Sequence, residues 1–127
     1  MKQPPSTLQR QLVLDAVKAR SDHPSADQIY LDVRAVNDRI SRSTVYRNLN
    51  VLVRMGMLHR VKLPDSDRYE YRPDKHYHLF CLGCGAVSDA PLDYPDELDE
   101  EMAIETGYSI ERHRVVFEGL CPDCQKR

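Results

Sequence analysis

The chain has 127 residues, of which 41% are hydrophobic and 30% are charged, and its formal net charge is −2. This composition is typical of one or two small globular units and excludes a wholly disordered chain. No run approaches the ~18 apolar residues of a membrane span, and the polar start is not a secretory signal, so we expect a cytoplasmic protein without a membrane partner.

The charge is unevenly distributed along the chain. Residues 1–72 carry 13 Lys and Arg against 8 Asp and Glu, which gives +5, whereas residues 73–127 carry 5 against 12, which gives −7. A basic half followed by an acidic half is expected when one part of the chain meets a polyanion, although a solvated surface can give the same imbalance. The apolar pattern also changes near Pro73, so we predict two domains, residues 1–72 and 73–127.

The first domain is predicted to contain three helices. Apolar residues recur at helical spacing near the start of the chain. A second helix should open at the capping box formed by Ser25 and Gln28. The third helix, SRSTVYRNLNVLVRMG, can be capped by Ser41 or Ser43 and stopped by Gly56.

A hairpin is predicted after the third helix. Two short β-prone runs, residues 57–61 and 68–71, flank the turn sequence PDSD. Three helices followed by a two-stranded wing form a winged helix-turn-helix, in which the third helix reads DNA. The following residues, 72–75, are predicted to form a hinge.

One face of the third helix is cationic and contains no acidic residue. Its members fall at helical spacing: Ser43, Tyr46, Arg47, Asn50 and Arg54. Long polar side chains and an aromatic ring on one face suit a helix in the DNA major groove. A solvated face without a partner is the alternative, but such faces usually mix both signs of charge.

The second half is predicted to be a small α/β domain, so the whole chain belongs to the α+β class. Strands are expected over residues 76–80, 86–89 and 109–118, with an acidic helix over 93–106. Such a small sheet is thinly stabilised alone, which suggests a zinc ion, a second subunit, or both.

Two tight cysteine pairs frame this domain. Cys81 and Cys84 form one Cys-x-x-Cys pair, and Cys121 and Cys124 form the other. Each pair can present two thiolates to one tetrahedral ion, which predicts a structural zinc site. Four thiolates leave the ion no open position, so the zinc should be inert. The alternative is dithiol catalysis.

Two histidines lie beside the first cysteine pair. His76 and His78 alternate along a strand and should project from the same face, which makes them a chelating pair. Glu70 and Asp89 offer oxygen ligands nearby, and a mixed nitrogen and oxygen set suits Fe(II), Mn(II) or Zn(II). Two surface histidines near a loop would give the same spacing.

Five motifs in register resemble the ferric uptake regulator (Fur) family of bacterial metal-dependent repressors. These motifs are the stretches HPSAD from residue 23, STVYRNL from residue 43, RYEY from residue 68, HYH with CLGC from residue 76, and the terminal CPDC. The match runs in order across nearly the whole chain.

The resemblance implies a homodimer that represses transcription from A/T-rich palindromic operator DNA. It implies a second, dimerisation domain and a reading helix that includes Thr44 beside the residues named above. By position it implies that a regulatory Fe²⁺ or Mn²⁺ is held by His23, Glu70, His76, His78 and Asp89. Because these ligands come from both domains and the hinge, metal binding would favour a closed arrangement of the two reading helices.

The signal is predicted from departures within the family. The iron-sensing branch often has a further metal site around the histidine pair, where this chain has Lys75 and Tyr77, although His113 remains. This loss resembles the peroxide-sensing branch, whereas Glu70 resembles the iron-sensing one, since the peroxide branch tends to have Asp there. Zinc sensing is disfavoured because the chain has no fifth cysteine. We predict a peroxide sensor, with an iron-responsive repressor as the alternative.

Two other classes of function stay open. A dithiol or metal-dependent enzyme is one, although the sequence offers no nucleophile with a recognisable base, no phosphate loop and no H-E-x-x-H motif, so we predict no enzyme. The other is a structural zinc module that binds DNA without sensing metal.

Overall fold

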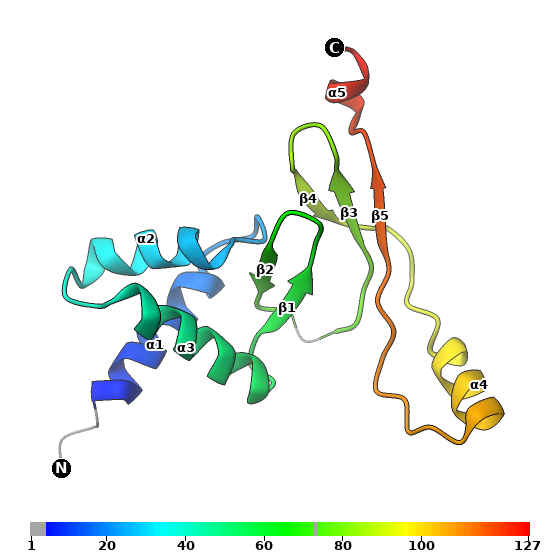
Figure 1. The fold of residues 1–127 in the computed structure, drawn as a ribbon, viewed down its shortest axis with the longest axis horizontal. Helices are drawn as coiled ribbons and strands as arrows, with labels where there is room; N and C mark the ends of the chain where they lie inside the picture. Colours follow the sequence, from blue (N-terminus) through cyan, green and yellow to red (C-terminus); the bar gives the residue numbers. More distant parts are fainter. Residues whose placement is uncertain (1–4, 73) are drawn as a thin grey trace. The chain divides into compact units, whose positions relative to one another are not determined.

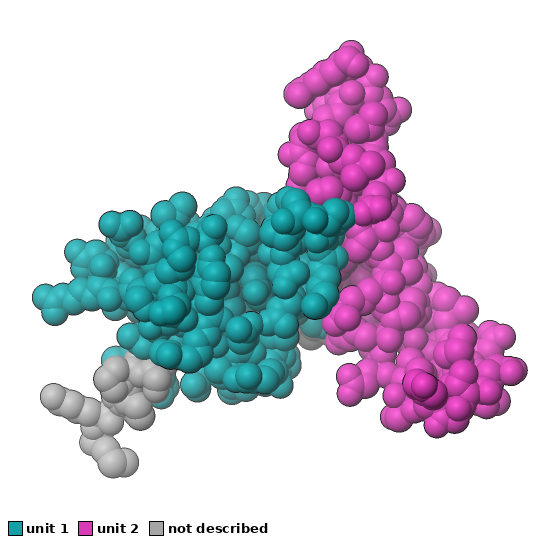
Figure 2. Space-filling model, in the orientation of Figure 1, with its two compact units in different colours: residues 1–73 teal, residues 74–127 magenta. Residues whose placement is uncertain are grey.

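The computed structural model describes residues 5–72 and 74–127, and it divides into two compact units, residues 1–73 and 74–127 (Figure 2). The α+β prediction is confirmed, since the chain forms three consecutive helices and two small, mainly antiparallel sheets, with two further helices near its end. Pro73 of the predicted hinge lies outside the described residues. No helix in the described part of the chain combines the length and apolar character needed to cross a membrane.

The first unit contains three helices and a hairpin (Figure 1). The elements are α1 (Pro5–Lys18), α2 (Ala26–Val36), α3 (Arg42–Arg54), β1 (His59–Lys62) and β2 (Asp67–Glu70). Apolar side chains of all three helices form one core, whose fully enclosed members include Val13, Val17, Ile29, Val45 and Leu49. The helical spacing of apolar residues therefore predicts this core, because each helix buries a single stripe.

Local signals set the helix ends of the first unit. Ser25 and Gln28 form the predicted capping box, with Ser25 Oγ accepting from the Gln28 amide and the Gln28 side chain accepting from the Ser25 amide. Of the two candidate caps for α3, the structure uses Ser41, whose hydroxyl oxygen accepts from the Thr44 amide at 3.1 Å. Gly56 follows α3 with φ 76°, a conformation that glycine adopts without strain.

The second unit is built on a three-stranded sheet. Its elements are β3 (His78–Cys81), β4 (Val87–Asp89), α4 (Asp96–Thr106), β5 (Val116–Gly119) and α5 (Pro122–Gln125). The strand order is β4-β3-β5, with β3 antiparallel to β4 and parallel to β5. Parallel neighbours need a crossover, and the segment containing α4 makes it (Figure 1).

The second unit has few buried side chains. No side chain of α4 is buried, and Leu98, Met102 and Ile104 on this helix are each at least half exposed. The sheet also exposes Leu79 and Phe117 in part. Tyr77, Phe80 and Ala90 are among the enclosed residues. This core is thin, as the sequence predicts.

Several bounds in this unit differ from the prediction: β3 begins at His78 rather than at His76, and α4 begins at Asp96 rather than at residue 93. The last strand begins at Val116 rather than at Ser109, because β3 spans only His78–Cys81 and offers no earlier partner. Cys81 is the final residue of β3, one residue beyond the predicted end of that strand. A short helix, α5, carries the terminal cysteine pair, which the sequence pattern did not predict.

Candidate metal centres and nucleic-acid interface

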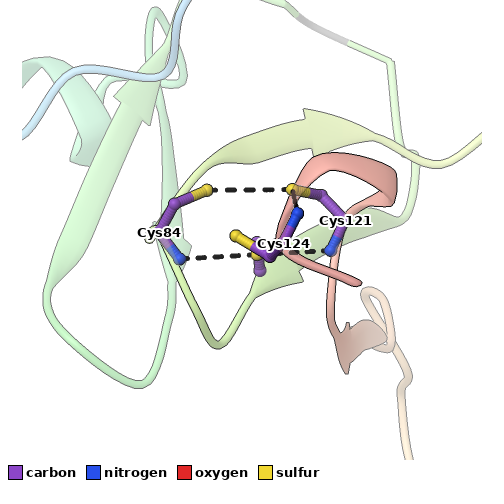
Figure 3. Close-up of side chains that lie close together, drawn as sticks. Cys84, Cys121 and Cys124 are labelled. Atoms are coloured by element: carbon purple, nitrogen blue, oxygen red, sulfur yellow. Dashed lines mark hydrogen bonds between the residues drawn. The ribbon is translucent and has the colours of Figure 1, made fainter. Parts of the chain in front are cut away.

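The four cysteines lie together at one end of the second unit. Cys81 ends β3, Cys84 follows in the turn, Cys121 caps α5 and Cys124 lies within that helix. Their Sγ atoms all lie within 4.8 Å of one another, and the Cys84 and Cys121 sulfurs are 4.0 Å apart (Figure 3). All four are free cysteines. The parallel pairing of β3 with β5 brings the two ends of the domain together.

Backbone amides stabilise negative charge in this cluster. The amides of Cys121 and Cys84 donate to Cys81 Sγ at 3.3 and 3.5 Å, and the Cys124 amide donates to Cys121 Sγ at 3.5 Å. These bonds, the one from Cys121 first, lower the pKa of Cys81 to about 6. The neighbouring thiols, Cys121 first, raise the pKa of Cys124 to about 12. Without a cation, this group of sulfurs cannot all ionise together.

The cluster fits a tetrahedral zinc ion. A tetrahedron with Zn–S bonds of ~2.3 Å has sulfur–sulfur edges of ~3.8 Å, close to the separation seen between Cys84 and Cys121. Gly83 leaves the space for this approach, because a Cβ at that position would lie 2.9 Å from Cys124 Sγ. Structural zinc sites use cysteine thiolates as ligands, and the backbone N–H donors described above stabilise the thiolate form.

Within the first unit, His23 and Glu70 form a buried pair. His23 Nε2 lies 3.0 Å from Glu70 Oε2, and the two side chains are 7% and 8% exposed. His59 Nδ1 lies 3.8 Å from Glu70 Oε1, because His59 and Glu70 face each other in the β1–β2 register. The sequence analysis missed His59. Hairpin register is the signal that places it there.

The backbone holds His23 next to β2. The Tyr69 amide donates to the Pro24 carbonyl at 2.9 Å, and Arg68 Nη1 donates to the His23 carbonyl at 3.3 Å. Ser25 makes an isolated β-bridge with Arg68. His23 itself has φ 55°, the only positive φ of a non-glycine residue in the described chain. Backbone strain of this kind clusters at functional sites.

Within the second unit, His76, His78 and Asp89 converge. His76 Nε2 and His78 Nε2 lie 3.2 and 3.7 Å from the same Asp89 oxygen. The two rings are 4.5 Å apart between centroids. Asp89 reaches them because it pairs with His78 in the β3–β4 register. The two histidines therefore converge as predicted, but not by alternation along a strand, because His76 precedes β3, which begins at His78.

The orientation of His76 suits a cation. Its Nδ1 lies 2.8 Å from the Asp74 carbonyl, which can only accept, so Nδ1 carries the proton. In the neutral ring, Nε2 then presents a lone pair to the Asp89 carboxylate. Two acceptors this close are stabilised by a cation between them, and separations near 3 Å match neighbouring ligands of an ion with bonds of ~2.1 Å.

His113 belongs to a separate cluster of the second unit. Its Nδ1 donates to Asp99 Oδ1 at 2.8 Å, which leaves Nε2 to accept from the Tyr77 hydroxyl at 2.6 Å. Its ring stacks on Tyr94 at 4.3 Å between centroids, and the Tyr94 hydroxyl donates to Asp99. All hydrogen-bonding atoms of the His113 ring are thus engaged within the protein. In this structure His113 is therefore packed against Tyr77, Tyr94 and Asp99.

The predicted DNA-reading face is exposed on α3. Tyr46 is 37% exposed, and Ser43, Arg47, Asn50 and Arg54 are also exposed. Thr44 differs, because it is half-buried and its hydroxyl accepts from Ser41 Oγ at 2.8 Å as part of the helix cap.

Residues of other elements contact side chains of α3 at or beside the predicted DNA-reading face. Asp27 of α2 accepts hydrogen bonds from Tyr46 and from Arg42, and Arg60 of β1 donates to Asn50. The acid-free helix face predicted from the sequence therefore has an acid beside it. Helical spacing within α3 could not reveal Asp27, because the packing of α2 against α3 brings it there.

Comparison with known proteins identifies the family that the sequence motifs indicate. The family model described as ferric uptake regulator family matches residues 3–118. The peroxide-responsive repressor of Staphylococcus saprophyticus is 34% identical over 122 residues, which cover 95% of this chain and 82% of that protein. The peroxide operon regulator of Bacillus subtilis is 32% identical over 95% of this chain and 84% of its own length.

Solved structures show the same fold. The crystal structure of the Campylobacter jejuni peroxide stress regulator superposes with a TM-score of 0.76 at 28% identity, covering 94% of this chain and 90% of that chain. The resemblance inferred from the sequence motifs is confirmed. This chain belongs to the ferric uptake regulator family.

Proposed function

We propose that this chain is a metal-dependent, DNA-binding transcriptional repressor that responds to peroxide. One observation carries the proposal. Histidine and carboxylate ligands form two half-sites, His23 with Glu70 in the winged-helix unit and His76 with His78 and Asp89 in the sheet unit. A single ion that binds both half-sites would couple metal occupancy to the arrangement of the reading helices.

The donor set suits a regulatory Fe²⁺ or Mn²⁺. Three imidazoles and two carboxylates form a mixed nitrogen and oxygen set, which these ions accept in five- or six-coordinate geometry. The four thiolates of Cys81, Cys84, Cys121 and Cys124 would hold a structural Zn²⁺ instead, since soft sulfur ligands select zinc. Bound Fe²⁺ would supply the redox chemistry with peroxide that Zn²⁺ lacks.

The surroundings of His76 and His23 would determine how peroxide affects the metal site. The Asp74 carbonyl fixes the His76 ring with Nε2 toward Asp89, and the β2 contacts hold His23 beside Glu70. Oxidation of either imidazole would remove a nitrogen ligand from one half-site. The two half-sites would then lose their common ion, and the closed arrangement that favours DNA binding would no longer be stabilised.

Peroxide is proposed as the signal because the names of the two relatives above refer to peroxide, as does that of the Campylobacter jejuni protein. An iron-responsive repressor is the second candidate, since the resemblance associates Glu70 with that branch. The relatives are named as repressors or regulators, and we propose no enzymatic role for this chain.

DNA recognition would use Ser43, Thr44, Tyr46, Arg47, Asn50 and Arg54 on an A/T-rich palindromic operator. A palindrome requires a two-fold partner, so the second unit would form a homodimer through its exposed apolar side chains. Free thiols and a redox-sensitive ligand set suit the cytoplasm, where we expect the protein to act.

A gel-shift titration tests the repressor. The zinc-loaded protein is titrated with Mn²⁺ or Fe²⁺ under anaerobic conditions against duplexes that it selects from a random library. We expect DNA binding to appear with the metal and to vanish with a chelator that leaves zinc in place. Binding that is indifferent to both additions would contradict metal dependence, and turnover of a disulfide without metal would favour the enzyme class.

Mass spectrometry separates the two signals. The Fe²⁺-loaded protein is treated with peroxide and digested, and we expect the peptides with His23 or His76 to gain one oxygen atom as DNA is released. The peptide with His113 is the internal control, because its ring is engaged by Asp99 and Tyr77 away from the half-sites. DNA release without any histidine oxidation would favour iron sensing.

A further inference from the structure

The reading face of α3 has an acidic neighbour from another helix. Asp27 lies in the first turn of α2, and its carboxylate accepts hydrogen bonds from the Tyr46 hydroxyl and from Arg42 Nη1. Tyr46 belongs to the proposed DNA contacts, and Arg42 precedes them on the same helix. One carboxylate therefore holds two side chains at the surface that would meet DNA.

The position of Arg42 is fixed from two sides. Its guanidinium lies over the Tyr30 ring at 4.5 Å from the ring centroid, while Asp27 accepts its hydrogen bond. Both Asp27 and Arg42 remain more than half exposed. An exposed ion pair of this kind adds little to the free energy of unfolding. Its effect is therefore expected on the binding of DNA to this surface.

The hydroxyl of Tyr46 is also fixed. Its hydrogen bond to Asp27 raises the pKa of Tyr46, so the hydroxyl keeps its proton and donates to the carboxylate at physiological pH. The ring edge is then held in one orientation, which suits contact with a thymine methyl group in the major groove. Fixing the ring before binding reduces the entropy lost when it meets a base.

We propose that Asp27 is a positioning and specificity residue of the DNA-reading face, holding Tyr46 for base contact and restraining Arg42 from indiscriminate phosphate contact. This inference rests on the proposed function. The negative charge weakens attraction to any phosphate backbone, whereas the fixed tyrosine improves the fit to the correct bases. Discrimination between operator and bulk DNA rises because the fixed tyrosine raises only the affinity for the correct bases, while the negative charge lowers the affinity for every sequence alike.

A simpler role for Asp27 would concern α2 alone. An acid in the first turn of a helix interacts favourably with the helix N-terminus, and Asp27 occupies that place. This role predicts a change in stability without a change in DNA discrimination. The experiment therefore measures both quantities.

The test compares Asp27→Asn with Asp15→Asn, which removes an acid from an exposed position on α1 of the same unit. Each Mn²⁺-loaded protein is titrated with an A/T-rich palindromic duplex selected by the wild type and with a G/C-rich duplex of equal length. For Asp27→Asn we expect affinity for both duplexes to rise about threefold to tenfold, because the charge is removed while the amide oxygen can still accept from Tyr46. The slope of log K against log salt should steepen by about 0.9, the equivalent of one phosphate contact.

Asp27→Ala tests the positioning role. The amide oxygen introduced by Asp27→Asn can still accept from the Tyr46 hydroxyl, whereas an alanine side chain cannot. The ratio of the two affinities should therefore fall in Asp27→Ala and stay close to the wild-type ratio in Asp27→Asn. Equal losses in the two variants would overturn the positioning role. An unchanged ratio of affinities in Asp27→Ala, or the same rise in affinity for both duplexes in Asp15→Asn, would overturn the whole inference.

The outcomes separate this inference from the proposed function. If the wild type selects no sequence and binds neither duplex with Mn²⁺, the proposed function fails and with it the basis of the inference. If the wild type discriminates and Asp27→Ala does so equally, only the inference fails. Thermal unfolding of each variant identifies any loss of folding.

Discussion

Gly83 is the residue that permits the cysteine cluster. A Cβ there would lie 2.9 Å from Cys124 Sγ and 3.3 Å from Leu120 Cδ2, so Gly83→Ala must displace the thiolate. We expect zinc affinity to fall about tenfold, as seen when support of metal ligands is disturbed. Competition with a chromogenic chelator measures the change.

Gly119→Ala is the matched control for this prediction. A Cβ at Gly119 would have no neighbour within 4 Å, although Gly119 lies opposite Cys81 in the sheet. Equal zinc loss in both variants would show that substitution of glycine, and not crowding of Cys124, is responsible.

Asp89 is the carboxylate of the second half-site. Because both histidines of the pair face one of its oxygens, Asp89→Asn removes the charge that would balance the proposed cation. We expect Mn²⁺ affinity to fall at least about tenfold, with zinc content unchanged. Isothermal titration of the zinc-loaded protein gives the affinity.

Asp93→Asn provides the comparison for Asp89, since Asp93 is exposed four residues further along and lies outside both metal clusters. Its Mn²⁺ affinity should equal that of the wild type. A similar loss in both variants would assign the effect to net charge.

Helix α4 is attached to the sheet unit through a polar cluster rather than a buried apolar stripe. The Tyr94 hydroxyl and the His113 ring both donate to Asp99, and they hold the pKa of that carboxyl below its ordinary value. A lowered pKa means that the contribution to stability is present above the ordinary value near 4 and is lost as the pH falls through the lowered value. It is fully present at neutral pH.

Asp99→Asn should therefore loosen α4 at neutral pH. Hydrogen exchange of the α4 amides should become faster by about tenfold, while the exchange of β3 changes less. Asp96→Asn, an exposed acid of the first turn of the same helix, is the control. If Asp96→Asn gives the same acceleration, helix-end charge and not the cluster holds α4.

The elements show where sequence reasoning succeeds. Ser25 and Gln28 form their capping box because the signal is local, and Gly56 ends α3 for the same reason. The cysteine pairs were predictable because each is a fixed spacing with one dominant chemistry. Helical spacing likewise predicts the core stripe of α3.

Other features depend on register or on packing between elements. His59 lies beside Glu70 only because the hairpin pairs them, and Asp27 reaches Tyr46 only because α2 packs on α3. The late start of β5 follows from the short length of β3. None of these distances along the chain carries a periodic signal, so the sequence alone could not place them.

At the scale of the molecule, the two units differ in how they are stabilised. The first has an apolar core made by three helices, whereas the second has a thin sheet, the thiol cluster and exposed apolar side chains. Below about 70 residues, a domain usually needs a metal or an oligomeric partner. The second unit should therefore depend on both.

Removal of zinc should affect the units unequally. We expect the zinc-free protein to lose the fold of the second unit and the proposed homodimer. Circular dichroism should retain most of the helical signal, because α1, α2 and α3 have 14, 11 and 13 residues and lie in the first unit. Sedimentation velocity before and after zinc chelation measures the oligomeric state. A zinc-free chain that stays dimeric would contradict this division of stability.

The left-handed backbone of His23 has a consequence for selection on this position. An L-residue with φ 55° costs the fold about 1 kcal/mol or more, a burden that glycine or asparagine would reduce. If folding alone were selected, mutation would drift toward those residues. A histidine here opposes that drift, so variants recovered for thermal tolerance should replace it often and should lose their response to metal when they do.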